Sequence, residues 1–224
     1  MTKKILFIFS SAILLLLSAC GQEVLPPQAF RPGWFYHATE DDRVKTPETL
    51  FKIYLESVGR GSSLILNLPP DRRGLLHEND VNALLGWKKL LDATFAVNLA
   101  ANAKAKADTW RGKSRQYAAT SVTDGNGETY WATDDGVTTG SIEISLGAPK
   151  KVNYILLQEY IRLGQRVKAF EVEAKNGDKW KKIAESTTVG YKRILPLGGV
   201  EASAVRVHVR ESKACPLISN IEIY

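Results

Sequence analysis

The sequence is poor in the residues and motifs on which many enzyme classes depend. Its 224 residues include only two cysteines and three histidines. Two cysteines are too few for a disulfide framework. The chain also has no CxxC motif, no glycine-rich phosphate loop and no Ser-His-Asp arrangement. Thiol redox, nucleotide and serine-hydrolase chemistry therefore find no support in the sequence.

A clustered basic stripe is likewise absent. The formal net charge is +6, part of it carried by Lys3 and Lys4 near the N-terminus. The other basic residues are interleaved with Asp and Glu, whereas a nucleic-acid footprint needs clustered Lys and Arg. We expect no nucleic-acid partner. With 44% hydrophobic and 24% charged residues, the composition is that of a globular protein and not of a disordered one.

Long apolar runs are absent as well, except over residues 5–17. This stretch follows two lysines and ends in the letters LSAC at 17–20. It is shorter than the roughly 20 residues that span a bilayer as a helix. The order of positive charge, apolar run and small residues is typical of a secretory signal peptide. We therefore predict a signal peptide over residues 1–19.

The LSAC ending also resembles the lipoprotein box of bacterial export signals. That resemblance implies lipid attachment at Cys20 and membrane anchoring through the lipid. Gly21 in place of Asp resembles sorting to the outer membrane, on its periplasmic or cell-surface side. An ordinary signal peptide with a chance cysteine is the alternative. Residues 20–30 are expected to be a tether, because they contain two prolines and no periodicity.

Residues 31–107 are predicted to form short α/β elements. The aromatic stretch RPGWFYH covers residues 31–37, and Thr46 followed by Pro47 is a helix-start signal for a helix that ends at Gly59. Residues 62–71 (SSLILNLPPD) predict a strand that is buried on both faces, as in parallel sheets. A long amphipathic helix follows over residues 80–98.

Residues 108–224 change to a pattern of strands separated by turn residues. Alternating or apolar segments recur at 141–147, 151–160, 167–175, 179–186, 191–197, 204–212 and 218–224. Asn176-Gly177 is a hairpin signal. Several short strands without a helical period predict a β-sandwich.

Long phrases of the sequence resemble a known enzyme family. RPGWFYH and SVGRGSSLILNLPPDRRGLLHENDV resemble the end of the catalytic barrel of glycoside hydrolase family 29, the α-L-fucosidases, and especially its α-1,3/1,4 branch. TDGNGETYWATDDG, LQEYIRLGQRVKAFEVEA and ISNIEIY resemble the discoidin-like sandwich, coagulation factor 5/8 type C, that follows the barrel. The implied fold class is α+β: the last units of a (β/α)8 barrel, then a jelly-roll type discoidin-like sandwich.

The resemblance also implies that most of the barrel is missing. LPPQAF at 25–30 is similar to the start of the mature family members, yet RPGWFYH follows at once. A closed barrel takes roughly 250 residues, far more than residues 31–107 supply. The resemblance implies a family of retaining glycosidases, whose members use an Asp as the nucleophile and a Glu as the acid/base residue. Neither has a matching position here, so we assign no catalytic residue.

Three hypotheses therefore stay open for the chain. It is a catalytically incomplete fragment of an α-L-fucosidase, or a surface lipoprotein module that binds carbohydrate or serves a structural role without catalysis. The third hypothesis is that a second chain supplies the missing barrel. Fucosylated glycans are the implied ligands. Four acidic residues could replace the missing carboxylates, but a solvated loop and a helix start explain them more simply: Glu40, Asp41, Asp42 and Glu48.

The implied substrate-binding residues lie in the RPGWFYH segment: Arg31, Trp34, Tyr36 and His37. Its aromatic residues fit a hydrophobic core equally well. His77 is expected at the entry of the long helix.

Discoidin-like domains often hold a structural Ca²⁺ with oxygen ligands. The loosely matching positions are Asp124, Asn126, Thr129 and Glu222. A plain turn is the alternative for DGNG, because Asp, Asn and Gly dominate turns. No other cofactor is implied. Residues available for sugar binding by the sandwich are Tyr130, Trp131, Tyr160, Arg162 and Arg166.

Overall fold

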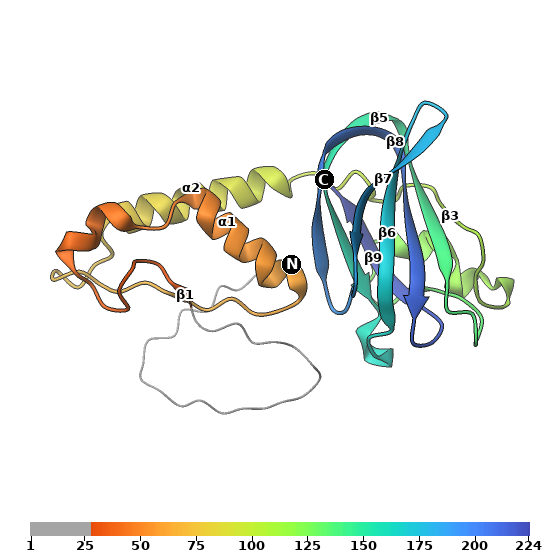
Figure 1. The fold of residues 1–224 in the computed structure, drawn as a ribbon, viewed down its shortest axis with the longest axis horizontal. Helices are drawn as coiled ribbons and strands as arrows, with labels where there is room; N and C mark the ends of the chain where they lie inside the picture. Colours follow the sequence, from red (N-terminus) through yellow and green to blue (C-terminus); the bar gives the residue numbers. More distant parts are fainter. Residues whose placement is uncertain (1–27) are drawn as a thin grey trace.

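The computed structural model describes residues 28–224, which form a helical segment (residues 28–98) packed against a β-rich part (residues 99–224) (Figure 1). The predicted signal peptide, the lipid attachment at Cys20 and most of the predicted tether lie outside the described residues. No helix among residues 28–224 has both the length and the apolar character needed to span a membrane.

The helical segment contains α1 (Pro47–Glu56) and α2 (Glu78–Thr94), which lie side by side (Figure 1). The predicted start of α1 is confirmed: the Thr46 side chain accepts a hydrogen bond from the Thr49 N–H, and Pro47 is the first helical residue. The expected bounds 80–98 for the second helix were wrong. His77 caps α2 by accepting the Asn79 N–H on Nδ1, so the helix begins at Glu78.

The predicted parallel strand exists only as a short ladder. β2 (Leu66–Asn67) pairs in parallel with β1 (Gln28–Ala29). The expectation that this strand is buried on both faces was wrong, because Ile65 is 57% exposed. Only one neighbouring strand and few packing partners are present among residues 28–224. Within the expected tether, by contrast, residues 28–29 are paired and Phe30 is fully buried.

The β-rich part is a sandwich built from seven strands: β3 (Ala105–Ala107), β4 (Trp131–Ala132), β5 (Gly140–Glu159), β6 (Val167–Asn176), β7 (Lys179–Ser186), β8 (Arg193–Ser212) and β9 (Leu217–Ile223). The remaining helices are short 3₁₀ turns at Ala38–Arg43, Val58–Arg60, Arg111–Lys113, Arg115–Tyr117, Ala119–Val122 and Ile161–Leu163.

Two long strands hold the sandwich together. The N-terminal half of β5 lies between β3 and the C-terminal half of β8, which also pairs with the β6–β7 hairpin. The C-terminal half of β5 lies between β9 and the N-terminal half of β8. These two sets of strands are the two layers of the sandwich, and β5 and β8 each contribute one half to both layers. The strands β5 and β8 continue through the predicted breaks at 148–150 and 198–203, with register shifts between Ser145 and Lys150 and between Val152 and Tyr154 of β5.

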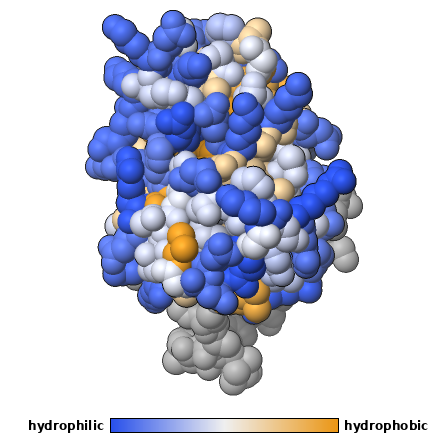
Figure 2. All heavy atoms as spheres, turned by 90° about the vertical axis from the view of Figure 1, so that its right-hand side faces the viewer, coloured by the Kyte–Doolittle hydropathy of each residue, from blue (hydrophilic) through white to orange (hydrophobic). Residues whose placement is uncertain are grey.

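The sandwich core follows from the alternation of the strands. Ile142 and Ile144 of β5 and Val205, Val207 and Val209 of β8 all point inward and are buried. The Asn176-Gly177 hairpin is confirmed, with Asn176 opposite Lys179 and Gly177 at φ +58°. The end of the sandwich that faces away from the helices is mostly hydrophilic (Figure 2).

An aromatic cluster joins the helical segment to the sandwich. Phe95, just after α2, packs edge-on against Tyr224 with ring centroids 5.0 Å apart. It also contacts Phe51, Tyr54 and Tyr154. The C-terminal half of α2 therefore uses its apolar face against β5 and the chain terminus. Its N-terminal half instead packs Ala83 and Leu84 against Phe30 and Leu50, while Leu85 is 60% exposed.

Candidate functional site

The RPGWFYH segment, which carries the predicted substrate-binding residues, starts one residue beyond β1, after Phe30. Arg31 is fully buried and is held by two carboxylates. Its Nε and Nη2 donate to Asp80 of α2 over 2.9–3.1 Å, and Nη1 donates to Asp41 Oδ1 over 2.7 Å. A guanidinium with both carboxylates in place has few free donors for a ligand. Arg31 therefore fastens this segment to α2.

Tyr36 and His77 complete what we call the Arg31 cluster (Arg31, Tyr36, Asp41, His77 and Asp80). The Arg31 guanidinium lies over the Tyr36 ring, 4.9 Å from its centroid, and the Tyr36 hydroxyl donates to Asp41 over 3.3 Å. His77 Nε2 is 3.3 Å from Asp41.

Two pKa values in the cluster shift as this geometry dictates. The hydrogen bond from Arg31 holds the pKa of the Asp41 carboxyl below its usual value, and His77 and the Tyr36 hydroxyl act in the same direction. Burial, followed by the nearby Asp41 charge, raises the pKa of the Tyr36 phenol. Asp41 therefore stays ionised as a structural anion, which is unsuitable for a general acid near neutral pH.

The other two predicted binding residues lie apart from this cluster. Trp34 is 48% exposed, and its carbonyl accepts a hydrogen bond from the Asn67 amide over 2.6 Å. Phe35 is 74% exposed, so these two aromatic residues do not form a core. His37 is exposed at the start of the Ala38–Arg43 turn. The structure thus brings Arg31 and Tyr36 together and leaves Trp34 and His37 on the surface.

The expectation of a fully solvated acidic loop was wrong for Glu40 and Asp41. Glu40 is buried, and its Oε2 accepts the Gly33 N–H over 3.0 Å. Asp42 and Glu48 are exposed, as expected. The loop folds back on the RPGWFYH segment because its carboxylates neutralise Arg31 and satisfy a backbone donor there.

Sequence reasoning missed Asp80, the main partner of Arg31. The sequence does contain an indication of this role, because Asp80 lies three residues before Ala83 and seven before Trp87, on the packed face of α2. A carboxylate on the apolar face of a helix requires a buried cation or hydrogen-bond donors.

Three of the four predicted calcium ligands share one turn. The Asp124 carboxylate accepts the Asn126 N–H over 2.8 Å and the Thr129 hydroxyl over 2.7 Å. Glu222 lies on β9, where it accepts hydrogen bonds from Asn220 and Tyr224. No group of three or more His, Cys, Asp or Glu side chains suited to a metal occurs among residues 28–224. The calcium site stays a prediction.

Of the residues predicted for sugar binding by the sandwich, Trp131 is buried and the other four are at least partly exposed. Trp131 is fully buried in the core. Tyr130 stacks on Tyr160, with centroids 4.4 Å apart. Arg162 pairs with Glu128, and Arg166 donates to the Cys215 sulfur over 2.8 Å.

Comparisons with known proteins identify a domain family in the β-rich part of the chain. Residues 101–221 match the F5/8 type C domain family. Alpha-L-fucosidase 1 of Arabidopsis thaliana is 31% identical over 211 residues, which are 91% of this chain and 41% of the relative.

Solved structures show the same similarity. The crystal structure of SpGH29 has a TM-score of 0.80 at 37% identity and covers 88% of this chain and 42% of that one. A Ruminococcus gnavus GH29 fucosidase in complex with fucose has a TM-score of 0.81 at 33% identity, covering 88% and 40%. This chain spans about 40% of the length of the curated relatives that it matches.

Proposed function

We propose a function from the premise that this chain belongs to the F5/8 type C domain family and has α-L-fucosidases as its relatives. The chain is a catalytically incomplete part of an α-L-fucosidase, and it does not hydrolyse fucosides by itself. The reaction of the complete enzyme would be removal of terminal α-L-fucose from glycans.

The observation that carries this proposal is the two-residue parallel ladder of β1 and β2. A (β/α)8 barrel closes when its first strand pairs with its last. A ladder between residue 28, near the start of the described chain, and residue 66, in the stretch that resembles the barrel's end, fits such a closure point. No other parallel pair occurs among residues 28–224, so the described chain has no barrel wall to hold a substrate.

The state of the carboxylates supports the same proposal. A retaining glycosidase needs two carboxyl groups about 5 Å apart, facing the two sides of the glycosidic bond. Near the RPGWFYH segment, Asp41 and Asp80 are bound to Arg31, and Glu40 is bound to the Gly33 N–H. Each of these carboxylates has a structural role that explains its presence.

The test is hydrolysis of a chromogenic α-L-fucoside by the full chain carrying Cys20→Ser. A complete family member, diluted over several orders of magnitude, sets the detection limit. We expect no release above the blank. Turnover that disappears in Asp42→Asn or Glu48→Gln, the two exposed acids of this region, would refute the proposal.

A second chain that supplies the missing barrel is part of the proposal, as is lipid anchoring through Cys20 at the outer membrane. Large apolar side chains exposed on the helical segment support a second chain that covers them. These side chains are Trp34, Phe35, Ile65, Leu75, Val81 and Leu85.

Co-expression with the part of SpGH29 that this chain does not cover tests this partner. We expect co-purification and fucosidase activity that neither piece shows alone. Leu85→Glu should weaken the complex, while Leu163→Glu, at a leucine of the sandwich that is also exposed, should not. Equal loss in both variants, or a complex without activity, would count against it.

A second candidate function is glycan binding by the sandwich without catalysis. The Tyr130–Tyr160 stack favours it, because aromatic side chains present an apolar face and a polar edge to a sugar. Tyr160→Ala should abolish binding of fucosylated or galactose-type glycans, and Tyr191→Ala, at an exposed tyrosine elsewhere, should leave it unchanged. Equal binding by both variants would exclude this site.

A further inference from the structure

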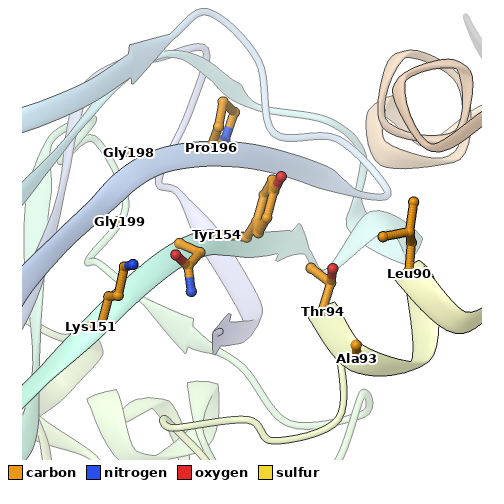
Figure 3. A pocket seen from close by; sticks show the side chains of 9 residues that line it. Leu90, Ala93, Thr94, Lys151, Tyr154, Pro196, Gly198 and Gly199 are labelled. Atoms are coloured by element: carbon orange, nitrogen blue, oxygen red, sulfur yellow. The ribbon is translucent and has the colours of Figure 1, made fainter. Parts of the chain in front are cut away.

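A groove of about 610 Å³ lies between the end of α2 and the long strands β5 and β8 (Figure 3). Its volume is within the roughly 300–1,000 Å³ of small-molecule sites, which often occur where two structural units meet. Leu90, Ala93 and Thr94 form the helix side. The opposite side comes from β5 and β8: Lys151, Asn153, Tyr154, Pro196, Gly198 and Gly199.

The floor of the groove is an irregular stretch of β8. Val152 is paired with Val200 and Tyr154 with Pro196, so residues 197–199 bulge opposite Asn153 alone. Gly198 and Gly199 both have positive φ, which glycine adopts without strain. A β-carbon on Gly199 would lie 2.9 Å from Lys151 Cε and 3.3 Å from Asn153 Oδ1. The missing side chain at Gly199 therefore leaves room for Lys151 and Asn153, while a β-carbon on Gly198 would have nothing within 4 Å.

The polar side-chain groups in this groove have no partners among residues 28–224. The Lys151 ammonium, the side-chain amide of Asn153 and the hydroxyls of Thr94 and Tyr154 make no hydrogen bond or ion pair there. Among residues 28–224, no Asp or Glu lines the groove, so the only formal charge that this part of the chain contributes to it is that of Lys151.

Apolar surface lies between these polar groups. Figure 3 shows the Tyr154 ring and Pro196 between Lys151 on one side and Leu90 and Thr94 of α2 on the other. One face of a sugar ring is apolar and packs on such surfaces, while its hydroxyls use amide and hydroxyl partners. One unpaired ammonium suits one carboxylate.

From this arrangement we infer that the groove binds a small acidic sugar, a uronic acid of one or two rings, with its carboxylate on Lys151. The ring hydroxyls bond to Asn153 and Thr94, and the apolar face of the ring packs on Tyr154 and Pro196. This site is separate from the RPGWFYH segment and does not depend on fucosidase activity.

The test is a chemical-shift titration of the ¹⁵N-labelled full chain carrying Cys20→Ser. The probes are D-glucuronic acid, D-glucose as the neutral sugar, and acetate as the anion alone. We expect saturable shifts around residues 151–154 and 196–199 with glucuronic acid, and weaker binding of both other probes. No saturation by glucuronic acid at millimolar concentration, or acetate binding equally well, would overturn the assignment.

Two variants and their controls locate the site. Lys151→Gln should weaken glucuronic acid binding about tenfold, the usual loss for a hydrogen bond to a charged group. Lys150→Gln, at the exposed neighbouring lysine outside the groove, should not. Ala93→Trp should block the groove, while Ala96→Trp, beyond the helix end, should not. Binding that survives both Lys151→Gln and Ala93→Trp would refute it.

Discussion

The buried ion pair between Arg31 and Asp80 allows a quantitative prediction about the helical segment. Asp80→Asn keeps the size of the side chain but removes the charge that faces the guanidinium. Both side chains are fully buried, so water cannot replace the lost carboxylate. Removing one partner of a buried pair costs about 3–5 kcal/mol. Because Asp41 remains 2.7 Å from Nη1, we expect the lower end of that range.

Urea unfolding followed by circular dichroism at 222 nm measures this loss, because both α-helices belong to the helical segment. A domain of ordinary stability has about 5–15 kcal/mol in total, so the expected shift is large. Asp92→Asn is the matched control on the same helix. Its pair with Lys88 is exposed, and such i,i+4 pairs contribute only about 0.3–0.5 kcal/mol.

A double variant separates charge from packing. Arg31→Met with Asp80→Leu removes both charges and fills the space with apolar side chains, a change that is often neutral or stabilising in buried pairs. We expect most of the lost stability to return. If Asp80→Asn unfolds at the same urea concentration as Asp92→Asn, the Arg31 cluster does not hold the segment and our explanation of it is wrong.

Three further predictions concern the same segment. Gly86→Ala should destabilise it by about 1–3 kcal/mol, because a β-carbon would lie 2.6 Å from Pro47 Cγ of α1; an unchanged urea midpoint would contradict this contact. Phe95→Ala should destabilise the protein by less than the roughly 3–5 kcal/mol of a core phenylalanine, since Phe95 is half-buried. Thermal melting of this variant should show the helices separating from the sandwich before the sandwich unfolds. One shared transition would argue against this separation. The pKa of Asp41 is lowered in the folded state, so the ionised Asp41 carboxylate stabilises the fold fully above the usual pKa of 3.8, and this stabilisation is lost as the pH falls through the folded pKa. Acid unfolding of the Asp41→Asn variant should lack this loss of stability. If the variant and the unchanged protein show the same dependence of stability on pH, this prediction is wrong.

Local signals in the sequence predicted much of the fold. Thr46-Pro47 predicted the start of α1, and the alternating segment at 204–212 predicted a strand, which forms the C-terminal half of β8 and buries Val205, Val207 and Val209. Turn residues were less reliable. Gly147 and Pro149 predicted a break between two strands, yet β5 continues as one bent strand because β8 pairs with it on both sides of the irregularity.

The candidate sites depended on contacts between distant residues, which single-sequence patterns do not contain. Arg31 was recognised through its motif, but its partner Asp80 lies 49 positions further along the chain. The groove at Lys151 could not be predicted, because it exists only where α2 meets β5 and β8. The exposure of Trp34 and Phe35 likewise follows from which elements fail to cover them.

The most direct test of catalytic incompleteness is covalent trapping. Retaining glycosidases form a glycosyl-enzyme intermediate on their nucleophile, and an activated 2-fluoro fucoside makes that intermediate accumulate. We would incubate the full chain carrying Cys20→Ser with this reagent, beside a complete family member, and measure intact masses. The account predicts a mass increase of one fluorofucosyl group on the complete enzyme and none on this chain. A stoichiometric increase on this chain, mapped to an aspartate or glutamate, would contradict it.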